Sequence, residues 1–203
     1  MNPTKEIRLE IGCGKKPRQG YLTCDVRELP EVNYVCAADK LPFEENTVDE
    51  VYSRHVVEHF TIKEFLKVLE EWNRVLKIGG VVYIICPNLL YHLKQVLEGS
   101  HASFYTKESG KNARYWGFGS LFGWQQDEYD IHKFGYYFEL LKDILEELGF
   151  ENIKDLTNTS SSLEQAPWHL EVSATKKQKA PDYQKSKFFW VTSIFWGESL
   201  LGE

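Results

Sequence analysis

Apolar residues occur along the chain in short runs typical of buried strands and in longer stretches with helical spacing. The short runs end at glycine, proline or acidic residues, and this pattern predicts seven strands. In chain order these strands cover residues 7–11, 21–26, 32–37, 48–53, 81–86, 151–156 and 169–175. Strands that alternate with helical segments are typical of an α/β fold, so we expect a doubly wound, mostly parallel sheet.

The clearest predicted helix covers residues 61–77. Thr61 and Glu64 have the spacing of a capping box, in which each side chain bonds a free backbone N–H of the first turn. The apolar residues then recur at spacings of four, three and four and form one buried face, made of Phe65, Leu69, Trp72 and Leu76. We expect Gly79-Gly80 to end this helix. A second helix is predicted over 138–148.

Two segments do not fit the alternation of strands and helices. Residues 99–137 are rich in aromatic side chains and in glycine, which favours a lid or binding loop over a plain connection. Residues 176–203 form a polar linker followed by an aromatic segment, whose apolar side chains must be covered. We therefore expect one domain over 1–175 and a C-terminal segment that docks on it, on a neighbouring domain or on a second copy.

Composition and charge exclude several classes of protein. The chain has 203 residues and a net charge of −6, which argues against nucleic-acid binding because phosphates require a basic surface. We expect no membrane span and no secretory signal, and hence a cytoplasmic protein, since the sequence has neither a long apolar stretch nor an apolar leader. The four cysteines form no C-x-x-C pair, and we expect buried free thiols.

The first candidate chemistry lies where the predicted strands end. Gly12-Cys13-Gly14 follows the first strand, and glycine there allows a sharp turn and close approach of a ligand. Asp25 ends the second strand, where a carboxylate can accept both hydroxyls of a ribose. Pro17 stands where a dinucleotide-binding fingerprint has its third glycine, and this counts against an NAD-dependent oxidoreductase.

Five motifs together resemble those of the class I S-adenosylmethionine-dependent methyltransferases, and most closely the small "type 11" group. They are LEIGCG (9–14), Asp25, ADKLPF (38–43), DEVYSRHVVEHF (49–60) and RVLKIGGVVYIICPN (74–88). The resemblance implies a Rossmann-like sheet of seven strands and S-adenosylmethionine as the cofactor. Only ten residues separate Gly14 from Asp25, so we expect the first helix of that fold to be short or replaced by a loop.

The resemblance also implies which residues hold the cofactor. The methionine end would be lined by Glu10, Gly12, Cys13 and Gly14. The ribose would bind Asp25, and the adenine would lie among Val26, Asp39, Lys40 and Leu41. The sulfonium would lie near the end of the fourth strand, at Ser53, Arg54 and His55.

The acceptor is indicated more weakly. The opening motif with LPF and VVEHF resembles methyltransferases of surface-glycan biosynthesis, which implies a sugar hydroxyl of a glycan or nucleotide sugar as acceptor. Methylation of a nucleic-acid base is disfavoured, because Pro87-Asn88 stands where Pro-Pro and an aromatic residue are expected. Another small molecule, aromatic or lipid-like, and a scaffold without catalytic activity stay open. A hydroxyl acceptor benefits from a base, for which His132 is the first candidate and His55 the second.

No metal ion is expected to take part. The string His55-Val56-Val57-Glu58-His59 matches the H-x-x-E-H pattern of inverted zinc peptidases. A zinc site would need a third ligand from a distant part of the chain, and the methyltransferase motifs already account for the segment. We expect Glu58 and His59 to hold the loop after the fourth strand through hydrogen bonds.

Overall fold

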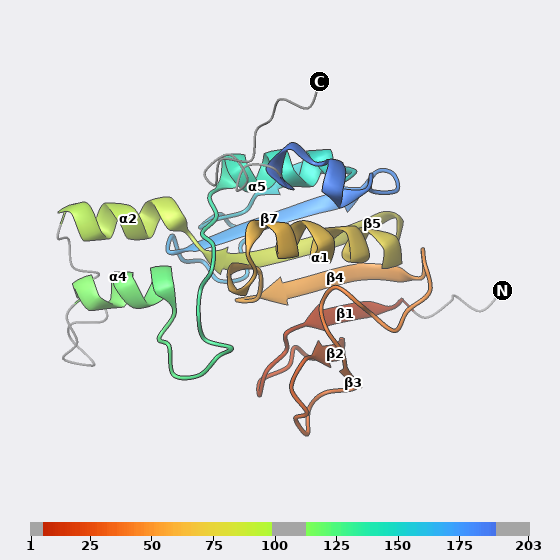
Figure 1. Ribbon diagram of the computed structural model, residues 1–203, viewed down its shortest axis with the longest axis horizontal. Coiled ribbons are helices and arrows are strands. Elements are labelled where there is room, and N and C mark those ends of the chain that lie inside the picture. The colour runs from red at the N-terminus through yellow and green to blue at the C-terminus, as the bar shows by residue number, and fades with distance from the viewer. Residues whose placement is uncertain (1–5, 99–112, 190–203) are drawn as a thin grey trace.

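Seven strands form one sheet in the order β3-β2-β1-β4-β5-β7-β6 (Figure 1). The structure, a computed structural model, describes residues 6–98 and 113–189. The strands are β1 Arg8–Ile11, β2 Leu22–Asp25, β3 Tyr34–Val35, β4 Val48–Arg54, β5 Leu76–Pro87, β6 Phe150–Asp155 and β7 His169–Lys176. The doubly wound, mostly parallel sheet that the sequence predicts is confirmed.

The first five strands are parallel, whereas β7 runs antiparallel to both β5 and β6. In register, Ile11 at the end of β1 pairs with Cys24 in β2 and with Ser53 in β4, and Ser53 pairs with Ile84 in β5. The carboxyl ends of these strands therefore meet at one edge of the sheet. Open α/β sheets bind their ligands at this edge.

The helices are α1 Ile62–Val75, α2 Leu89–Glu98, α4 Ala113–Phe122 and α5 Phe138–Glu147, with short 3-10 turns η1 Val57–His59 and η2 Tyr183–Lys185. The predicted capping box of Thr61 and Glu64 is present at the start of α1. The predicted apolar face of this helix is buried in the core, where α1 packs on β5 and α5 on β6 and β7. Both α2 and α4 lie beyond the carboxyl edge of the sheet and contact each other (Figure 1).

Three local predictions differ from the structure. Helix α1 ends at Val75, not at Gly79-Gly80, because the backbone of Asn46 and Thr47 bonds its last carbonyls and Leu76 already pairs with β4. The third strand is limited to two residues at the edge of the sheet. Residues 12–21 contain no helix, as the short spacing between Gly14 and Asp25 predicts.

The described part of the C-terminal segment lies against α1 and α5. The backbone N–H of Ala180 donates to Asn73 of α1, and that of Lys187 donates to Glu147 of α5. The ammonium of Lys63 lies 4.8 Å from the ring centre of Phe189. The later aromatic residues of this segment, 190–196, lie outside the described residues, as do 99–112 of the predicted lid.

Two further expectations concern the described residues. No helix among them is long and apolar enough to cross a bilayer. The four cysteines are free thiols, and Cys13, Cys24 and Cys86 are buried. Burial raises the pKa of Cys13 to about 11, so this thiol stays protonated near neutral pH.

Candidate functional site

A cavity of about 600 Å³ opens at the carboxyl edge of the sheet, between the ends of β1, β2 and β4 and the loop that follows α4. We call it the cofactor cavity. Its lining includes five carboxylates and two basic side chains, namely Asp25, Asp39, Asp127, Glu128 and Asp130 with Arg27 and Lys133. Of the residues expected to hold the cofactor, five line it: Gly12, Asp25, Val26, Asp39 and His55.

Gly12 forms the floor where β1 ends. Its φ is +68°, a conformation that favours glycine, and its N–H donates to Cys24 O at 2.7 Å. A Cβ added to Gly12 would lie 2.4 Å from Val56 Cγ2, so the loop after β4 packs directly on this glycine. Gly12 therefore allows the loop after β1 and the loop after β4 to pack closely, in addition to leaving room for a ligand.

Asp25 is held in place by backbone and side-chain donors. Its Oδ2 accepts from Gly14 N at 2.9 Å, and its Oδ1 accepts from Arg27 N at 2.9 Å. The Arg27 guanidinium adds two more bonds, from Nε to Oδ1 at 3.0 Å and from Nη2 to Oδ2 at 3.1 Å. Burial alone would raise the pKa of Asp25, but the bonds from Arg27 and Gly14 outweigh it and lower the pKa. The carboxylate is therefore ionised, and Arg27 is its partner.

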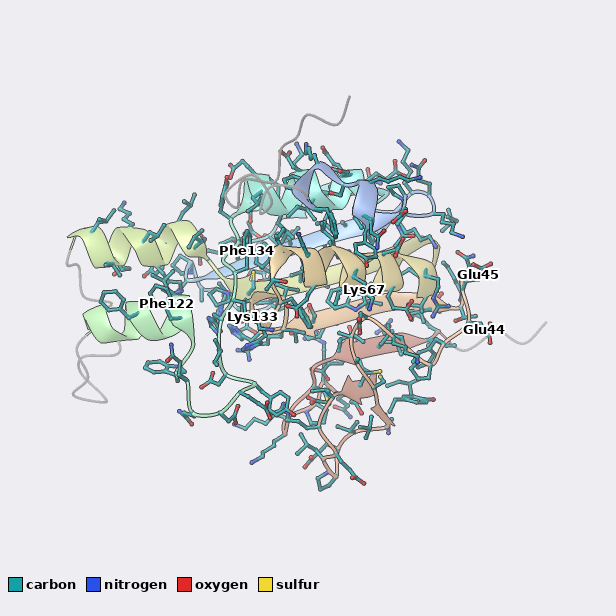
Figure 2. All side chains as sticks on the ribbon, in the orientation of Figure 1. Glu44, Glu45, Lys67, Phe122, Lys133 and Phe134 are labelled. Carbon is teal, nitrogen blue, oxygen red and sulfur yellow. The ribbon has the colours of Figure 1, made fainter. Side chains whose placement is uncertain are left out.

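Asp39 also lines the cofactor cavity and forms an ion pair with Lys67 (Nζ–Oδ2 2.7 Å), which projects from α1 (Figure 2). Lys40 and Leu41, expected beside the adenine, do not line the cavity. Leu41 is buried in the core and its N–H donates to Glu71. Of the residues expected beside the adenine, the exposed Val26 and the half-buried Asp39 are therefore the two that line the cavity.

The other expected residues at the methionine end lie next to the cofactor cavity and do not line it. Glu10 is buried and accepts from the backbone N–H of Arg18, and burial raises its pKa. The thiol of Cys13 donates to Gly14 O. Gly14 contributes its N–H to Asp25. These residues shape the loop after β1, whose predicted contact with the cofactor stays a prediction.

Ser53 and Arg54 are not brought into the cofactor cavity. Ser53 is fully buried, and its hydroxyl has no hydrogen-bond partner among the described residues. Arg54 forms a two-point ion pair with Glu164, with Nε–Oε1 at 2.6 Å. Successive residues of a strand point to opposite faces, so neither side chain points along the strand toward the edge. His55, with φ of +55°, is the first residue after β4 that lines the cavity.

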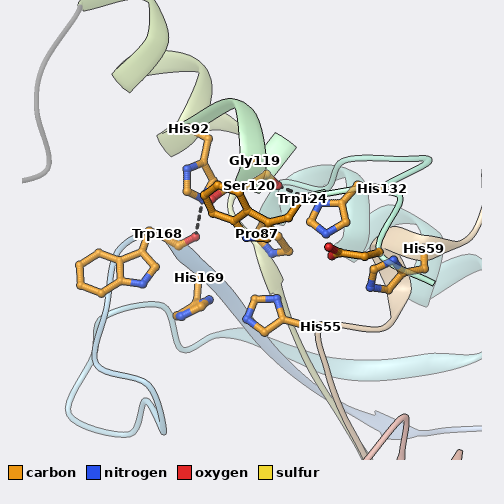
Figure 3. Close-up of a pocket in the computed structure, with 11 residues that line it drawn as sticks. His55, His59, Pro87, His92, Gly119, Ser120, Trp124, His132, Trp168 and His169 are labelled. Atoms are coloured by element: carbon orange, nitrogen blue, oxygen red, sulfur yellow. Dashed lines mark hydrogen bonds between the residues drawn. The ribbon is translucent and has the colours of Figure 1, made fainter. Parts of the chain in front are cut away.

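A second cavity of about 360 Å³ adjoins the first (Figure 3). All five histidines among the described residues line it, and we call it the histidine cavity. Its lining is His55, His59, Pro87, His92, Gly119, Ser120, Trp124, Asp130, His132, Trp168 and His169. Both cavities share His55, His59 and Asp130, so these three residues mark the boundary between them.

Hydrogen bonds fix the orientation of each ring at this boundary. His55 Nδ1 lies 3.0 Å from Glu58 Oε1, His59 Nδ1 lies 3.1 Å from Ile131 O, and His132 Nδ1 lies 2.9 Å from Ser120 O. A carbonyl oxygen only accepts, so His59 and His132 carry their proton on Nδ1 and present Nε2 as an acceptor. Burial lowers the pKa of His132, which favours this neutral form.

Deeper in the histidine cavity, His92 and His169 are also neutral. Burial lowers the pKa of each to about 4. His92 Nε2 lies 3.0 Å from Trp168 O, and His169 packs edge-on against His55 with ring centres 4.9 Å apart. At neutral pH these rings therefore offer hydrogen bonds without adding positive charge.

The loop after α4 supplies residues to both cavities. It turns back at Gly123, where an added Cβ would lie 1.8 Å from Asp130 O, so this close approach requires glycine. The N–H groups of Lys133 and Phe134 both donate to Glu58 O, at 2.8 and 3.2 Å. Lys133 then reaches the first turn of α1, where its ammonium lies 3.3 Å from Glu64 Oε2 (Figure 2). Main-chain bonds thus tie His132 to the segment after β4.

Sequence reasoning missed several residues of the two cavities. Arg27, the partner of Asp25, and Tyr129, whose ring lies 5.8 Å from the Arg27 guanidinium, had no motif to mark them. His92, Trp168 and His169 come from α2 and from the start of β7, and only the fold brings them together. Glu58 and His59 were expected to act through hydrogen bonds, and such bonds are present. The H-x-x-E-H string was the one signal that pointed to this cluster.

Known proteins share both sequence and fold with this chain. Residues 17–84, a third of the chain, match a family described as methyltransferase domain. An S-adenosylmethionine-dependent methyltransferase from Archaeoglobus fulgidus is 19% identical, with TM-score 0.54 over 84% of this chain and 86% of that one. A methyltransferase from Thermotoga maritima, described as a possible histamine N-methyltransferase, is 17% identical, with TM-score 0.52 over 87% and 84%. No curated protein matches the sequence.

These likenesses to solved structures establish the fold. Residues 17–84 thus match a methyltransferase domain, and the solved structures of similar fold include S-adenosylmethionine-dependent methyltransferases, so S-adenosylmethionine is the cofactor against which the cavity is tested. The residues of the cofactor cavity fit that group. A sulfonium is cationic, and the lining carries more carboxylates than basic groups. Asp25 at the end of β2 is ionised, and it can accept from ribose hydroxyls once the Arg27 guanidinium moves off its oxygens.

Proposed function

We propose that this chain transfers a methyl group from S-adenosylmethionine to a hydroxyl of a sugar, in a glycan or a nucleotide sugar, held in the histidine cavity. The observation that carries the proposal is the boundary formed by His55, His59 and Asp130, which line both cavities. A ligand in the cofactor cavity and an acceptor in the histidine cavity would meet there. Methyl transfer requires this kind of adjacency, since nucleophile, methyl and sulfur must be nearly collinear.

The lining of the histidine cavity suits a carbohydrate. Trp124 and Trp168 provide indole faces, against which the C–H faces of a sugar ring pack. Asp130 and the imidazoles provide acceptors and donors for several hydroxyls, as expected of a pocket that fixes orientation through a few polar groups. Because the pKa of His92 and of His169 is about 4, both rings are neutral at pH 7. They can therefore hydrogen-bond sugar hydroxyls without adding positive charge to the cavity.

His55 is the proposed base. When bound, the cofactor supplies an electrophilic methyl group. The buried Glu58 accepts from His55 Nδ1, which leaves Nε2 to take the proton of the acceptor hydroxyl. Among the two candidates from the sequence, His55 lines both cavities, whereas His132 lines only the histidine cavity. We therefore place His55 first and assign His132 to the acceptor.

The loop of residues 123–134 is proposed to cover both ligands. Its carboxylates Asp127 and Glu128 face the cofactor cavity, and Trp124 and His132 face the histidine cavity. Covering both cavities would exclude water from the transfer and hold the two ligands in contact.

The test is incubation of the full chain with isotope-labelled S-adenosylmethionine and a panel of nucleotide sugars, glycan oligomers, phenols and lipid-like alcohols. Mass spectrometry would detect the added methyl group. We expect labelled product from a sugar, and loss of that product when Asp25 is replaced by alanine. Labelling of phenols or alcohols but of no sugar would overturn the acceptor. Failure to bind S-adenosylmethionine in calorimetry would overturn the function as a whole.

A further inference from the structure

Three acceptor groups converge at the boundary of the two cavities. One ligand atom from each of Glu58, His59 and His132 lies within 4.8 Å of the others. Both imidazoles donate their Nδ1 proton to a backbone carbonyl, so their Nε2 atoms carry lone pairs. The rings of His59 and His132 stand edge-on with centres 5.0 Å apart and lie next to each other in Figure 3.

Glu58 adds an uncompensated carboxylate oxygen to this cluster. The residue is 1% exposed, and Oε1 is bonded by His55, but no donor among the described residues reaches Oε2. A buried carboxylate oxygen without a partner is costly, and native structures rarely keep one unless an ion or water supplies the missing contact. Glu58 Oε2 is therefore a buried acceptor atom at this cluster that lacks a donor among the described residues.

The cluster is held by the main chain and not by mobile side chains alone. Glu58 O accepts from Lys133 N and Phe134 N, and His59 Nδ1 donates to Ile131 O. His132 N and Nδ1 donate to Phe122 O and Ser120 O. Histidines that ligate metals commonly donate their other ring N–H to a carbonyl or carboxylate, which fixes the tautomer and orients the ring. Both histidines here have that support.

We propose that Glu58, His59 and His132 bind a divalent transition-metal ion of the zinc or cobalt type. Two imidazoles and one carboxylate form the set of protein ligands used by open, catalytic zinc sites. An ion equidistant from three atoms 4.8 Å apart would lie about 2.8 Å from each, against about 2.0–2.2 Å for zinc ligands, so each side chain must move inward by less than about 1 Å.

The ion would leave coordination positions open toward the histidine cavity, which His59 and His132 line. An oxygen of the acceptor could fill such a position, and a metal-bound hydroxyl loses its proton more readily. This role rests on the proposed function, whereas binding of the ion does not. The proposed ligand set differs from that of the H-x-x-E-H pattern, because Glu58 takes the place of His55 and the distant ligand is His132.

Calorimetric titration of the full chain with zinc chloride, after dialysis against a chelator, tests the site without cofactor or acceptor. We expect saturable binding of one ion per chain. Glu58→Gln and His132→Gln should each weaken zinc affinity by at least about tenfold. Cobalt(II) titration gives a second readout, because a nitrogen–oxygen site of low coordination number produces intense visible absorption. The intensity should fall in both variants.

His169→Asn is the matched control, since His169 lines the same cavity but belongs to no such cluster. It should keep wild-type zinc affinity. Absence of saturable binding, or equal affinity in wild-type, Glu58→Gln and His132→Gln, would overturn the site. A melting curve on each variant shows whether it is folded, and if Glu58→Gln is not, His132→Gln carries the test. A negative result leaves methyl transfer as measured by product formation unaffected, so the two proposals fail separately.

Discussion

The guanidinium of Arg27 occupies the same carboxylate oxygens of Asp25 that a ribose would need. Arg27 Nε and Nη2 bond Oδ1 and Oδ2, and the remaining positions are filled by the backbone N–H groups of Arg27 and Gly14. Each carboxylate oxygen accepts about two hydrogen bonds, so Asp25 has no acceptor left. Binding of the cofactor through Asp25 therefore requires the Arg27 side chain to move away.

Replacing Arg27 by alanine should strengthen cofactor binding. The change frees two acceptor positions on Asp25 while both backbone donors remain. The guanidinium is partly exposed, with 39% of its side chain accessible, so the pair it forms is worth about 0.2–1 kcal/mol. We expect the dissociation constant of S-adenosylmethionine to fall by up to roughly fivefold in calorimetry.

Asp25→Ala is the comparison variant and should change the affinity for the cofactor in the opposite direction. It removes the carboxylate and should weaken binding by about tenfold to over a hundredfold, since a hydrogen bond to a charged group is worth roughly 1.5–3 kcal/mol. If Arg27→Ala weakens binding instead, the guanidinium contacts the cofactor directly. If Asp25→Ala leaves the affinity unchanged, the ribose does not bind Asp25.

The fully buried Asn73 links three segments, and its loss should destabilise the fold. Its Nδ2 donates to Leu148 O and to Gln178 O, and its Oδ1 accepts from Ala180 N. Asn73→Ala leaves these three backbone groups without their partner, at a cost of about 2–4 kcal/mol. The melting temperature should fall by roughly 5–15 °C. Gln184→Ala, an exposed amide, is the control. Equal melting temperatures would mean that water replaces all three bonds.

The fold could be predicted because its elements follow local rules. The stripe of Phe65, Leu69, Trp72 and Leu76 and the capping box of Thr61 and Glu64 depend only on nearby residues. The end of α1 could not be predicted in this way. It is set by hydrogen bonds from the backbone of Asn46 and Thr47, which lie far from Gly79 in the sequence. These long-range hydrogen bonds end the helix at Val75, before the chain reaches the predicted stop at Gly79.

The candidate site could be predicted only where a strand end fixes the position. Gly12 and Asp25 follow strands and line the cofactor cavity, as the motifs imply. Arg54 also ends a strand, but its side chain forms an ion pair with Glu164, a residue 110 positions away, and does not line the cavity. The histidine cavity is assembled from four separate segments, so no local pattern could reveal that five histidines meet.

Acidification should destabilise the protein through His92 and His169. Burial holds the pKa of each at about 4, below the value of about 6.5 in an unfolded chain. Between these values the unfolded chain binds protons that the folded chain does not, so the free energy of unfolding falls as the pH is lowered. The loss should be roughly 1–2 kcal/mol for each histidine at about pH 5.

Urea unfolding at a series of pH values measures this loss. His169→Asn should flatten the dependence of the unfolding free energy on pH between about 6.5 and 4, because one of the two groups no longer titrates. Carboxylates away from His169 contribute equally to wild-type and variant, so the difference between the two curves reports His169 together with Glu164, whose Oε2 lies 3.8 Å from His169 Nε2. Parallel curves would show that His169 becomes protonated in the folded protein at its ordinary pKa.

The roles of His55 and His132 can be separated by steady-state kinetics. His55 lines both cavities and its Nδ1 is held by Glu58, so His55→Gln should lower kcat by about 10²–10⁴-fold, the usual contribution of a general base. His132 lines the histidine cavity alone, so His132→Gln should mainly raise the KM of the acceptor.

Cofactor affinity provides the check that both variants keep an intact cofactor cavity. It should change less than about threefold in either one, because Gly12 and Asp25 are untouched. If His132→Gln lowers kcat by a hundredfold and His55→Gln by less than about threefold, the acceptor is activated through His132, as base or as ligand of the proposed metal ion, and His55 only separates the two cavities. If cofactor affinity collapses in His132→Gln, the loop of residues 123–134 holds the cofactor and does not serve the acceptor.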